Sequence, residues 1–399
     1  MRMRGQAKAC PRLSADTSIQ AAHMHCGSLQ HRGGESGVGG KGAIMKTIRL
    51  EELTSLYVRI AEALGASAEE AEIFARCMAR ADLRGMFTQG ASMIPYSVEL
   101  IQKGIAKFGV PLEVIREEPG MILADGHLGV GVVTGTWAME LAINKARQAG
   151  VGCVWVKNGG DFMMTANHVL QAVEQDMVGI VVRNEAARVA PWGGMEPFFF
   201  TNPIAVGIPA AEEPPIVIDM AAGSFSVGVT VMAARDGQRM PSAHLVTEDG
   251  RYTDDPREIV VDPMNRESPL RGAIVTLGHK GLAWALIVEL LSGLLAGTNT
   301  SNQNDFKPSA DRPWSEAQFH MAIDVSKLRP VDEFKSATDD FIRSLRSVKP
   351  AQGFEGVVVP GEIEAKNEQQ RRREGVPIRE EVGEQVVEVA DSLGVSVEG

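Results

Sequence analysis

The chain has 399 residues, 44% of them hydrophobic and 23% charged, which is enough for two or three compact units around a sizeable core. Its formal net charge of −11 makes nucleic acid and anionic membrane surfaces unfavourable partners and leaves small-molecule substrates open. The four cysteines show neither a CxxC pair nor a regular spacing, which argues against a disulfide framework or a metal site and favours a cytoplasmic protein.

Residues 1–44 differ from the rest of the chain. They have no sustained apolar periodicity, and six Lys or Arg stand against two acidic residues. An Arg-rich, acid-poor start is typical of an organelle transit peptide, but we favour a gene-model extension ahead of a true start at Met45. Under either interpretation we expect this segment to be disordered and outside the fold.

The next part of the chain is predicted to be helical. Apolar residues recur at helical spacing over 53–64. Ser67 is the expected N-cap of a second helix that stops near Gly85, and a third helix spans about 91–102.

Strands and helices then alternate, which predicts a sheet covered by helices. The expected elements are strands at 121–125, 151–158 and 179–184 and helices at 134–149 and 164–175. Prolines interrupt the alternation between 191 and 209, and the pattern over 216–262 is richer in strands. The apolar run at 281–296 is too short for a membrane span of roughly 20 residues and contains Glu289, so we expect a buried helix.

These elements predict two domains besides the N-terminal extension. An α/β domain is expected over 121–329. A smaller helical domain is expected over 45–120, joined by the polar segment 330–399.

Two glycines after the first strand, Gly129 and Gly131, suggest a dinucleotide-binding turn. The full fingerprint needs a third glycine at position 134, which is Thr134, and an acidic residue about 20 positions later, which is missing. We therefore expect a plain turn between strand and helix and no standard nucleotide-binding fold.

Three later stretches have both a functional and a structural interpretation. The segment 189–209 combines paired glycines, prolines and aromatic residues, which suits either a ligand wall or a rigid packed connection. Asp219 at the end of an apolar strand could accept hydrogen bonds from ribose hydroxyls or cap the following turn. Lys280 at the start of the long helix could bind a phosphate with the helix N-terminus or remain solvated.

Taken in order, these stretches resemble the malate/L-lactate/ureidoglycolate dehydrogenase family over about residues 45–377. The matching segments are ADLRG (81–85), VAPWGG (189–194), TNPIA (201–205), IDMA (218–221), the GxKG pattern (278–281) and EGVPI (374–378). The resemblance implies an oxidoreductase that binds NAD or NADP on a mixed-sheet, L-sulfolactate dehydrogenase-like α/β domain that is not a Rossmann fold. It also implies a homodimer acting on a small-molecule substrate.

The resemblance also assigns site residues. It implies a substrate side that includes Arg84 of ADLRG and Met93. The expected cofactor contacts are Asp219, Met220, Ala221, Lys280, Glu185, Pro191 and Gly193.

The substrate side departs from the family pattern. After ADLRG the family continues with Ser-His-Gly and an Arg that grips the substrate carboxylate, whereas this chain has Thr88, Gln89 and Gly90 and then Met93. The histidine that acts as general acid/base in the family corresponds to Asp161. Losing the Arg removes a bidentate grip on a carboxylate, so an uncharged, bulkier or cationic substrate fits better, with Asp161 as counter-charge.

Two functions remain open. In the first, the chain transfers a hydride to or from a small carbonyl, hydroxy or imine compound, and the acid is Asp161 or a relay through Gln89, Thr88 and His168. His168 is also interpretable as an ordinary surface or core histidine. In the second, the chain has lost dehydrogenase activity and is a ligand-binding protein or a non-redox enzyme. The retained cofactor-side residues, such as Asp219 and Lys280, favour the first.

Overall fold

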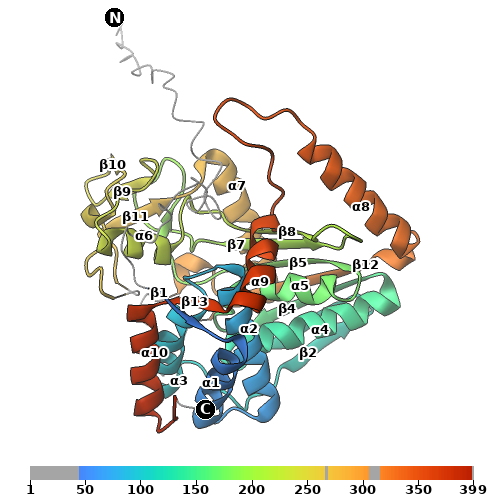
Figure 1. Ribbon diagram of the computed structural model, residues 1–399, viewed down its shortest axis with the longest axis horizontal. Helices are drawn as coiled ribbons and strands as arrows, with labels where there is room; N and C mark the ends of the chain where they lie inside the picture. Colours follow the sequence, from blue (N-terminus) through green and yellow to red (C-terminus); the bar gives the residue numbers. More distant parts are fainter. Residues whose placement is uncertain (1–44, 266–267, 305–314, 398–399) are drawn as a thin grey trace, which may run out of the picture.

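The structure is a computed structural model that describes residues 45–265, 268–304 and 315–397 (Figure 1). The predicted extension at 1–44 lies outside the described residues.

A mixed seven-stranded sheet forms the centre of the molecule (Figure 1). In spatial order its strands are β2 (Glu113–Glu118), β3 (Met121–Asp125), β4 (Val151–Lys157), β12 (Ala317–Asp324), β5 (Met177–Arg183), β7 (Pro203–Ile208) and β8 (Ile216–Ala221). Only β3 and β4 run parallel, and the other neighbouring pairs are antiparallel. This topology differs from the parallel sheet of a Rossmann domain and confirms the predicted mixed-sheet α/β fold.

Helices cover both faces of this sheet. On one face, α4 (Gly131–Ala149) and α5 (Ala166–Val173) pack against β4, β12, β5 and β7. On the other face lie α7 (Gly278–Glu289) and the π-helical turn that continues it, η5 (Leu290–Leu294). Alternate residues of β4 divide between the two layers, since Val154 joins the core under α4 while Trp155 joins the cluster under α7.

The α7–η5 segment corrects one prediction, because only its inner face is buried. Ala285, Val288 and Glu289 face inward, whereas Leu286 and Leu290 are 55% and 50% exposed. No helix in the described ranges is long and apolar enough to cross a membrane.

The helical unit lies below the sheet in Figure 1 and confirms the predicted N-terminal helices. It contains α1 (Leu50–Ala63), α2 (Ala68–Arg84), the short turn η3 (Ala91–Met93) and α3 (Ile94–Gln102). Ser67 forms the predicted N-cap as part of a capping box with Glu70, and Gly85 ends α2 in the left-handed conformation.

Part of the C-terminal segment packs on this unit. β13 (Val376–Arg379) pairs with β1 (Met45–Ile48), while α9 (Glu362–Glu374) packs on α2 and α10 (Glu380–Ser392) packs on α3. In contrast, α8 (Val331–Arg346) lies at the sheet, where Asp339 accepts hydrogen bonds from the backbone after β7. The predicted domain boundaries therefore stay a prediction.

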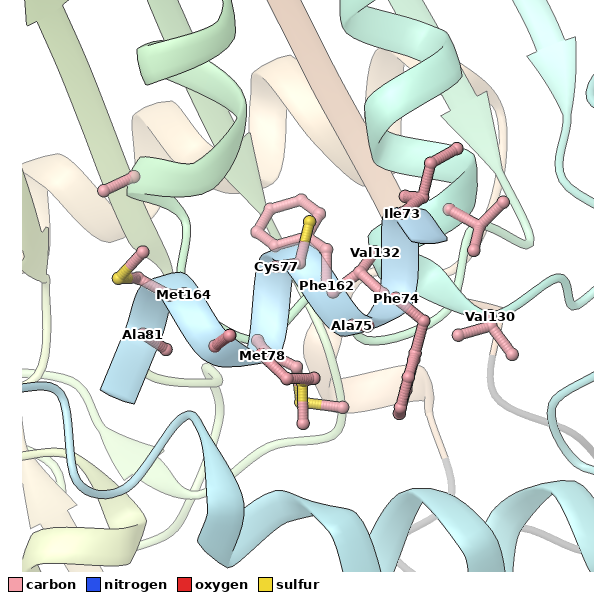
Figure 2. Close-up of a cluster of buried hydrophobic side chains, with 14 of the residues drawn as sticks. Ile73, Phe74, Ala75, Cys77, Met78, Ala81, Val130, Val132, Phe162 and Met164 are labelled. Atoms are coloured by element: carbon pink, nitrogen blue, oxygen red, sulfur yellow. The ribbon is translucent and has the colours of Figure 1, made fainter. Parts of the chain in front are cut away.

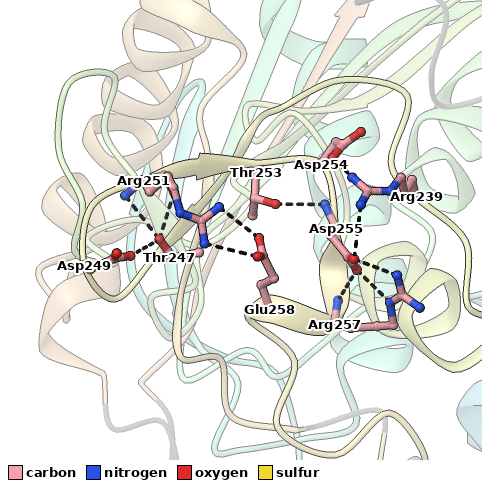
Figure 3. Close-up of polar contacts among 9 residues, drawn as sticks. All are labelled: Arg239, Thr247, Asp249, Arg251, Thr253, Asp254, Asp255, Arg257 and Glu258. Atoms are coloured by element: carbon pink, nitrogen blue, oxygen red, sulfur yellow. Dashed lines mark hydrogen bonds and ion pairs between the residues drawn. The ribbon is translucent and has the colours of Figure 1, made fainter.

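A smaller four-stranded sheet stands beside the main one. Its order is β10 (Tyr252–Thr253), β9 (Leu245–Thr247), β11 (Gly272–Val275) and β6 (Val189–Ala190). Ion pairs tie its outer turns together, among them Arg251 with Glu258 at 3.1 Å and Arg257 with Asp255 at 2.6 Å (Figure 3). The segment predicted as strand-rich also contains a helix, α6 (Val227–Arg235), which Ser226 caps through the Val229 amide.

Candidate active site

An acidic cluster surrounds Arg183 at the end of β5. The Arg183 guanidinium lies 3.0 Å from Asp161, which follows β4, and 2.9 Å from Glu185. Nη2 makes both of these contacts, and Nη1 donates to Glu316, just before β12, at 2.9 Å. Three neighbouring strands therefore bring these groups together, and the structure joins two predicted site residues, Asp161 and Glu185.

The guanidinium at the centre of this cluster is held on its edges and on its faces. Its carbon lies 5.2 Å from the ring centre of Phe162 and 5.1 Å from that of Phe200. Arg183 is only 4% exposed. Its two terminal nitrogens are bonded to carboxylates and its faces are stacked, while its Nε is buried without a partner among the described residues. Arg183 therefore does not offer a free cation to a substrate.

The acidic cluster has more carboxylates than cations. The side chains of Asp161 and Glu185 are 13% and 7% exposed, whereas that of Glu316 is 1% exposed. Burial, and then the charge of Glu185, raise the pKa of Glu316 well above its usual range. Three carboxylates thus surround the single guanidinium of Arg183, and Asp161 is the most exposed of the three.

The central strand β12 holds the turn that carries Asp161 in place. Gln318 on β12 donates hydrogen bonds to the carbonyls of Gly159 and Gly160 at 2.8 and 2.9 Å. Asp161 itself accepts from the Met163 amide at 2.8 Å. Phe162 then enters the hydrophobic core beside α2 (Figure 2).

The same turn explains the glycines after β3. A Cβ on Gly131 would lie 2.2 Å from the Asp161 carbonyl oxygen, so only glycine permits this close approach. The start of α4 is therefore covered by the 159–161 turn. The Gly129–Gly131 pair forms a packed turn, as predicted from the incomplete fingerprint.

The segments expected to bind the cofactor converge at one place. The Thr276 amide, two residues before α7, bonds the Ala190 carbonyl at 3.1 Å, at the start of the VAPWGG segment. The next amide, from Leu277, bonds the Ala222 carbonyl just after β8 at 2.9 Å. The VAPWGG loop, the end of β8 with Met220 and Ala221, and the start of α7 with Lys280 thus lie side by side.

Asp219 lies on β8 but points toward a neighbouring helix. One of its oxygens accepts from the Ala166 amide at the start of α5 at 2.8 Å. Burial raises its pKa to about 7, partly offset by that hydrogen bond and by Arg84. Asp219 thus bonds an amide of α5 and not the turn that follows it, which was the structural interpretation, and its contact with a cofactor stays a prediction.

The ADLRG corner is organised by the buried Asp82. Its carboxylate accepts from the Tyr57 hydroxyl at 2.9 Å and from the Ala91 amide at 2.9 and 3.0 Å. A Cβ on Gly90 would lie 2.0 Å from this carboxylate, so the Thr88–Gly90 loop folds tightly onto it. Burial raises the pKa of Asp82 to about 7.

The predicted substrate-side residues differ in accessibility. Thr88 and Gln89 are partly exposed on the loop beside Asp82, whereas Met93 is 1% exposed within the core. Arg84 is 4% exposed and its guanidinium bonds Glu368 at 3.2 Å. Neither Met93 nor Arg84 presents a free surface to a substrate in this conformation.

His168 lies in the core. It is fully buried between Phe162 and His320, with ring centres 4.9 and 5.3 Å away, and its nitrogens have no hydrogen-bond partner among the described residues. Burial lowers its pKa to about 3, so the ring is neutral. The structure does not bring His168 together with Gln89 or Thr88 through any hydrogen bond.

Comparison with known proteins gives the chain its family. The family model for malate/L-lactate dehydrogenase matches residues 48–387. The chain belongs to the malate/L-lactate dehydrogenase family. Its sequence is 32% identical to malate/(S)-sulfolactate dehydrogenase of Methanothermus fervidus, over 87% of this chain and 98% of that protein.

The chain is also similar to a reductase and to a solved malate dehydrogenase. The Δ1-pyrroline-2-carboxylate/Δ1-piperideine-2-carboxylate reductase of Pseudomonas putida is 30% identical over 83% of this chain and 93% of its own. The solved malate dehydrogenase of Entamoeba histolytica superposes with a TM-score of 0.84 at 27% identity, over 89% of this chain and all of that one. Family membership makes this chain an oxidoreductase that acts on CH–OH groups.

Within the family, the acidic cluster was only partly predictable from sequence. Asp161 stood out because it replaces a histidine, but Arg183 and Glu316 were missed. A signal was present, because two charged residues flank Asn184 directly after the apolar strand GIVV. No group of three His, Cys, Asp or Glu side chains suited to a metal ion occurs within the described ranges.

Proposed function

We propose that this chain transfers a hydride between NAD or NADP and a small carbonyl, hydroxy or imine compound whose reacting end is uncharged or cationic. The observation that carries the proposal is the acidic cluster, in which Asp161 is the most exposed carboxylate and Arg183 is already bonded. A substrate carboxylate beside these groups would meet like charge, whereas a protonated imine or amine would meet a counter-charge.

The converging loops fit a nicotinamide dinucleotide, which would supply the hydride when bound. Gly193 and Gly278 have positive φ angles of 88° and 57°, and a Cβ added to either would meet open space. Lys280 is exposed in the first turn of α7. The amides of that turn and the ammonium of Lys280 would hold the pyrophosphate.

Asp161 would act on the substrate side of the proposed cofactor-binding loops. Arg183 and the Met163 amide both bond its Oδ1 atom and so fix its orientation. We assign it the role of positioning and stabilising positive charge on the reacting atom. Thr88 and Gln89 are the partly exposed hydroxyl and amide groups of the facing corner, and we propose that they bind the substrate oxygen or nitrogen.

The proposal includes a cytoplasmic homodimer. The outer face of α7–η5 exposes a contiguous apolar surface, which is typical of a subunit interface. Its members are Trp284, Leu286, Ile287, Leu290, Leu294 and Leu295, each at least 40% exposed. Because this face belongs to the helix whose first turn carries Lys280, a dimer would form next to the proposed cofactor-binding loops.

The experiment for this proposal is a titration of residues 45–399 with NADH and with NADPH, followed by quenching of tryptophan fluorescence. Saturable binding of either nucleotide, followed by its oxidation with a neutral carbonyl or cyclic imine, supports the oxidoreductase. Binding of neither would favour the alternative, a family member that has lost dehydrogenase activity and acts on other ligands.

A further inference from the structure

A cleft of about 390 Å³ opens between α2, α4 and α5, and none of the proposed active-site residues lines it. Its walls carry three guanidinium groups, from Arg76 and Arg80 on α2 and Arg147 on α4. Its volume lies within the range of sites for small molecules, roughly 300–1,000 Å³. Two carboxylates, of Glu140 and Glu174, also line it, so the arginines outnumber the acidic residues.

Only one of these arginines is neutralised by an ion pair. Arg80 lies 2.7 Å from Glu174. Arg76 makes no hydrogen bond or ion pair with any part of the chain that the structure describes, although it faces the cleft. A guanidinium that lines a concave site without a partner retains all its donors for an anion.

Arg147 is oriented by neutral groups. It donates to the side-chain oxygens of Asn144 at 3.0 Å and of Gln175 at 2.6 Å. These amides fix the plane of the guanidinium and leave its charge uncompensated, so it can still bind a carboxylate through its remaining N–H groups.

The remaining carboxylate at the cleft does not cancel this charge. Burial, and then the charge of Glu69, raise the pKa of Glu140, and the charge of Arg76 partly offsets this rise. Even with Glu140 ionised, two guanidiniums without an ion pair, Arg76 and Arg147, face one carboxylate. They come from different helices, so a ligand with two anionic groups could bridge the walls.

The floor of the cleft is polar and buried. Thr136 and Asn167 line it at 2% and 4% exposed. The Asn167 amide donates to the Cys77 carbonyl at 3.2 Å, and its oxygen has no partner among the described residues. A ligand hydroxyl that reached this floor would supply the missing donor.

We propose that this cleft is a second binding site, separate from the active site, for a small di- or tricarboxylate that carries a hydroxyl group. The two carboxylates bind Arg76 and Arg147, and the hydroxyl faces the buried amide of Asn167.

Citrate is the probe for a calorimetric titration of residues 45–399. Its alcohol carbon bears no hydrogen, so citrate cannot be a hydride donor at the active site. The variant is the double substitution Arg76→Gln/Arg147→Gln, on exposed side chains whose change leaves the core intact. The matched control is Arg373→Gln, an exposed arginine on α9.

We expect one citrate per chain, at least about tenfold weaker binding in the double variant, and unchanged binding in the control. Tricarballylate, which lacks the hydroxyl, should bind more weakly than citrate. NADH and NADPH titrations of the double variant should match the parent chain, which separates this site from the proposed function. Absence of citrate binding, or equal affinity in the parent chain and the double variant, would overturn the proposal.

Discussion

Single residues decide how the ADLRG corner is built, and Gly90 is the clearest case. A Cβ here would lie 2.0 Å from an oxygen of the Asp82 carboxylate, which leaves no room for a side chain. We predict that Gly90→Ala lowers the free energy of unfolding by about 1–3 kcal/mol, since the added methyl would displace a buried, hydrogen-bonded carboxylate. Urea denaturation measures this loss.

The matched control for that substitution is Gly356→Ala. A Cβ at position 356 meets open space, and the backbone there is not in the left-handed region. This variant should unfold at the same urea concentration as the parent chain. Equal stability of the Gly90 and Gly356 variants would show that the corner is not held as described.

Glu316 gives a prediction about pH. Its pKa is raised in the folded state by burial and by Glu185, so its protonated form stabilises the fold at low pH. That stabilisation is lost as the pH rises through the folded-state value. We predict that Glu316→Gln, which cannot ionise, gains stability relative to the parent chain as the pH rises from 5 to 9. Thermal unfolding measures the stability of both proteins across this range. A difference in stability that did not change with pH would contradict the account.

At the scale of elements, β12 links the sheet to the active-site turn. Gln318 on this strand donates to two carbonyls of the turn that carries Asp161. We predict that Gln318→Leu lowers turnover by about tenfold or more and the free energy of unfolding by about 1–3 kcal/mol, because both carbonyls lose a buried donor. Steady-state kinetics and denaturation measure these effects.

The control for β12 is Gln370→Leu, on an exposed face of α9. It should change neither turnover nor stability. Nucleotide binding should persist in both variants, because Gln318 touches no segment of the proposed cofactor cleft. Full turnover in Gln318→Leu would exclude β12 as the support of the turn.

The elements also show where sequence patterns succeed and fail. The α1–α3 and α4–β4–α5–β5 elements follow apolar periodicity and capping residues, so they were predictable. β12 was missed because Gln318 and His320 break its apolar pattern at positions that are buried only in the folded sheet. α6 was missed because its β-branched residues favour strands, and tertiary packing overrides that preference.

At the scale of the whole molecule, the family motifs predicted which loops would bind the cofactor, but contacts distant in sequence form the acidic cluster. Asp161, Arg183 and Glu316 are brought together by the order β4–β12–β5, which no local pattern reveals. The burial of His168 likewise depends on packing against His320 of β12 and Gly135 of α4. Charge partners of this kind follow from the topology and could not be predicted from spacing.

The apolar face of α7–η5 leads to a prediction for the assembly. We predict that the chain is a homodimer in solution and that Leu290→Arg, at a residue 50% exposed on this face, shifts it toward monomer. Light scattering after size-exclusion chromatography measures the mass. Leu328→Arg, at a residue 81% exposed elsewhere, should leave the dimer intact. A monomeric parent chain, or a dimer unaffected by Leu290→Arg, would contradict the interface.

The central claim is that the acidic cluster selects against an anionic substrate, and one pair of substrates tests it most directly. Pyruvate and pyruvamide have the same ketone, but beside it pyruvate has a carboxylate and pyruvamide has a neutral amide. With whichever nucleotide binds, we predict a kcat/KM for pyruvamide at least about tenfold above that for pyruvate, and a smaller ratio in Asp161→Asn. A kcat/KM for pyruvate equal to or above that for pyruvamide would contradict the account.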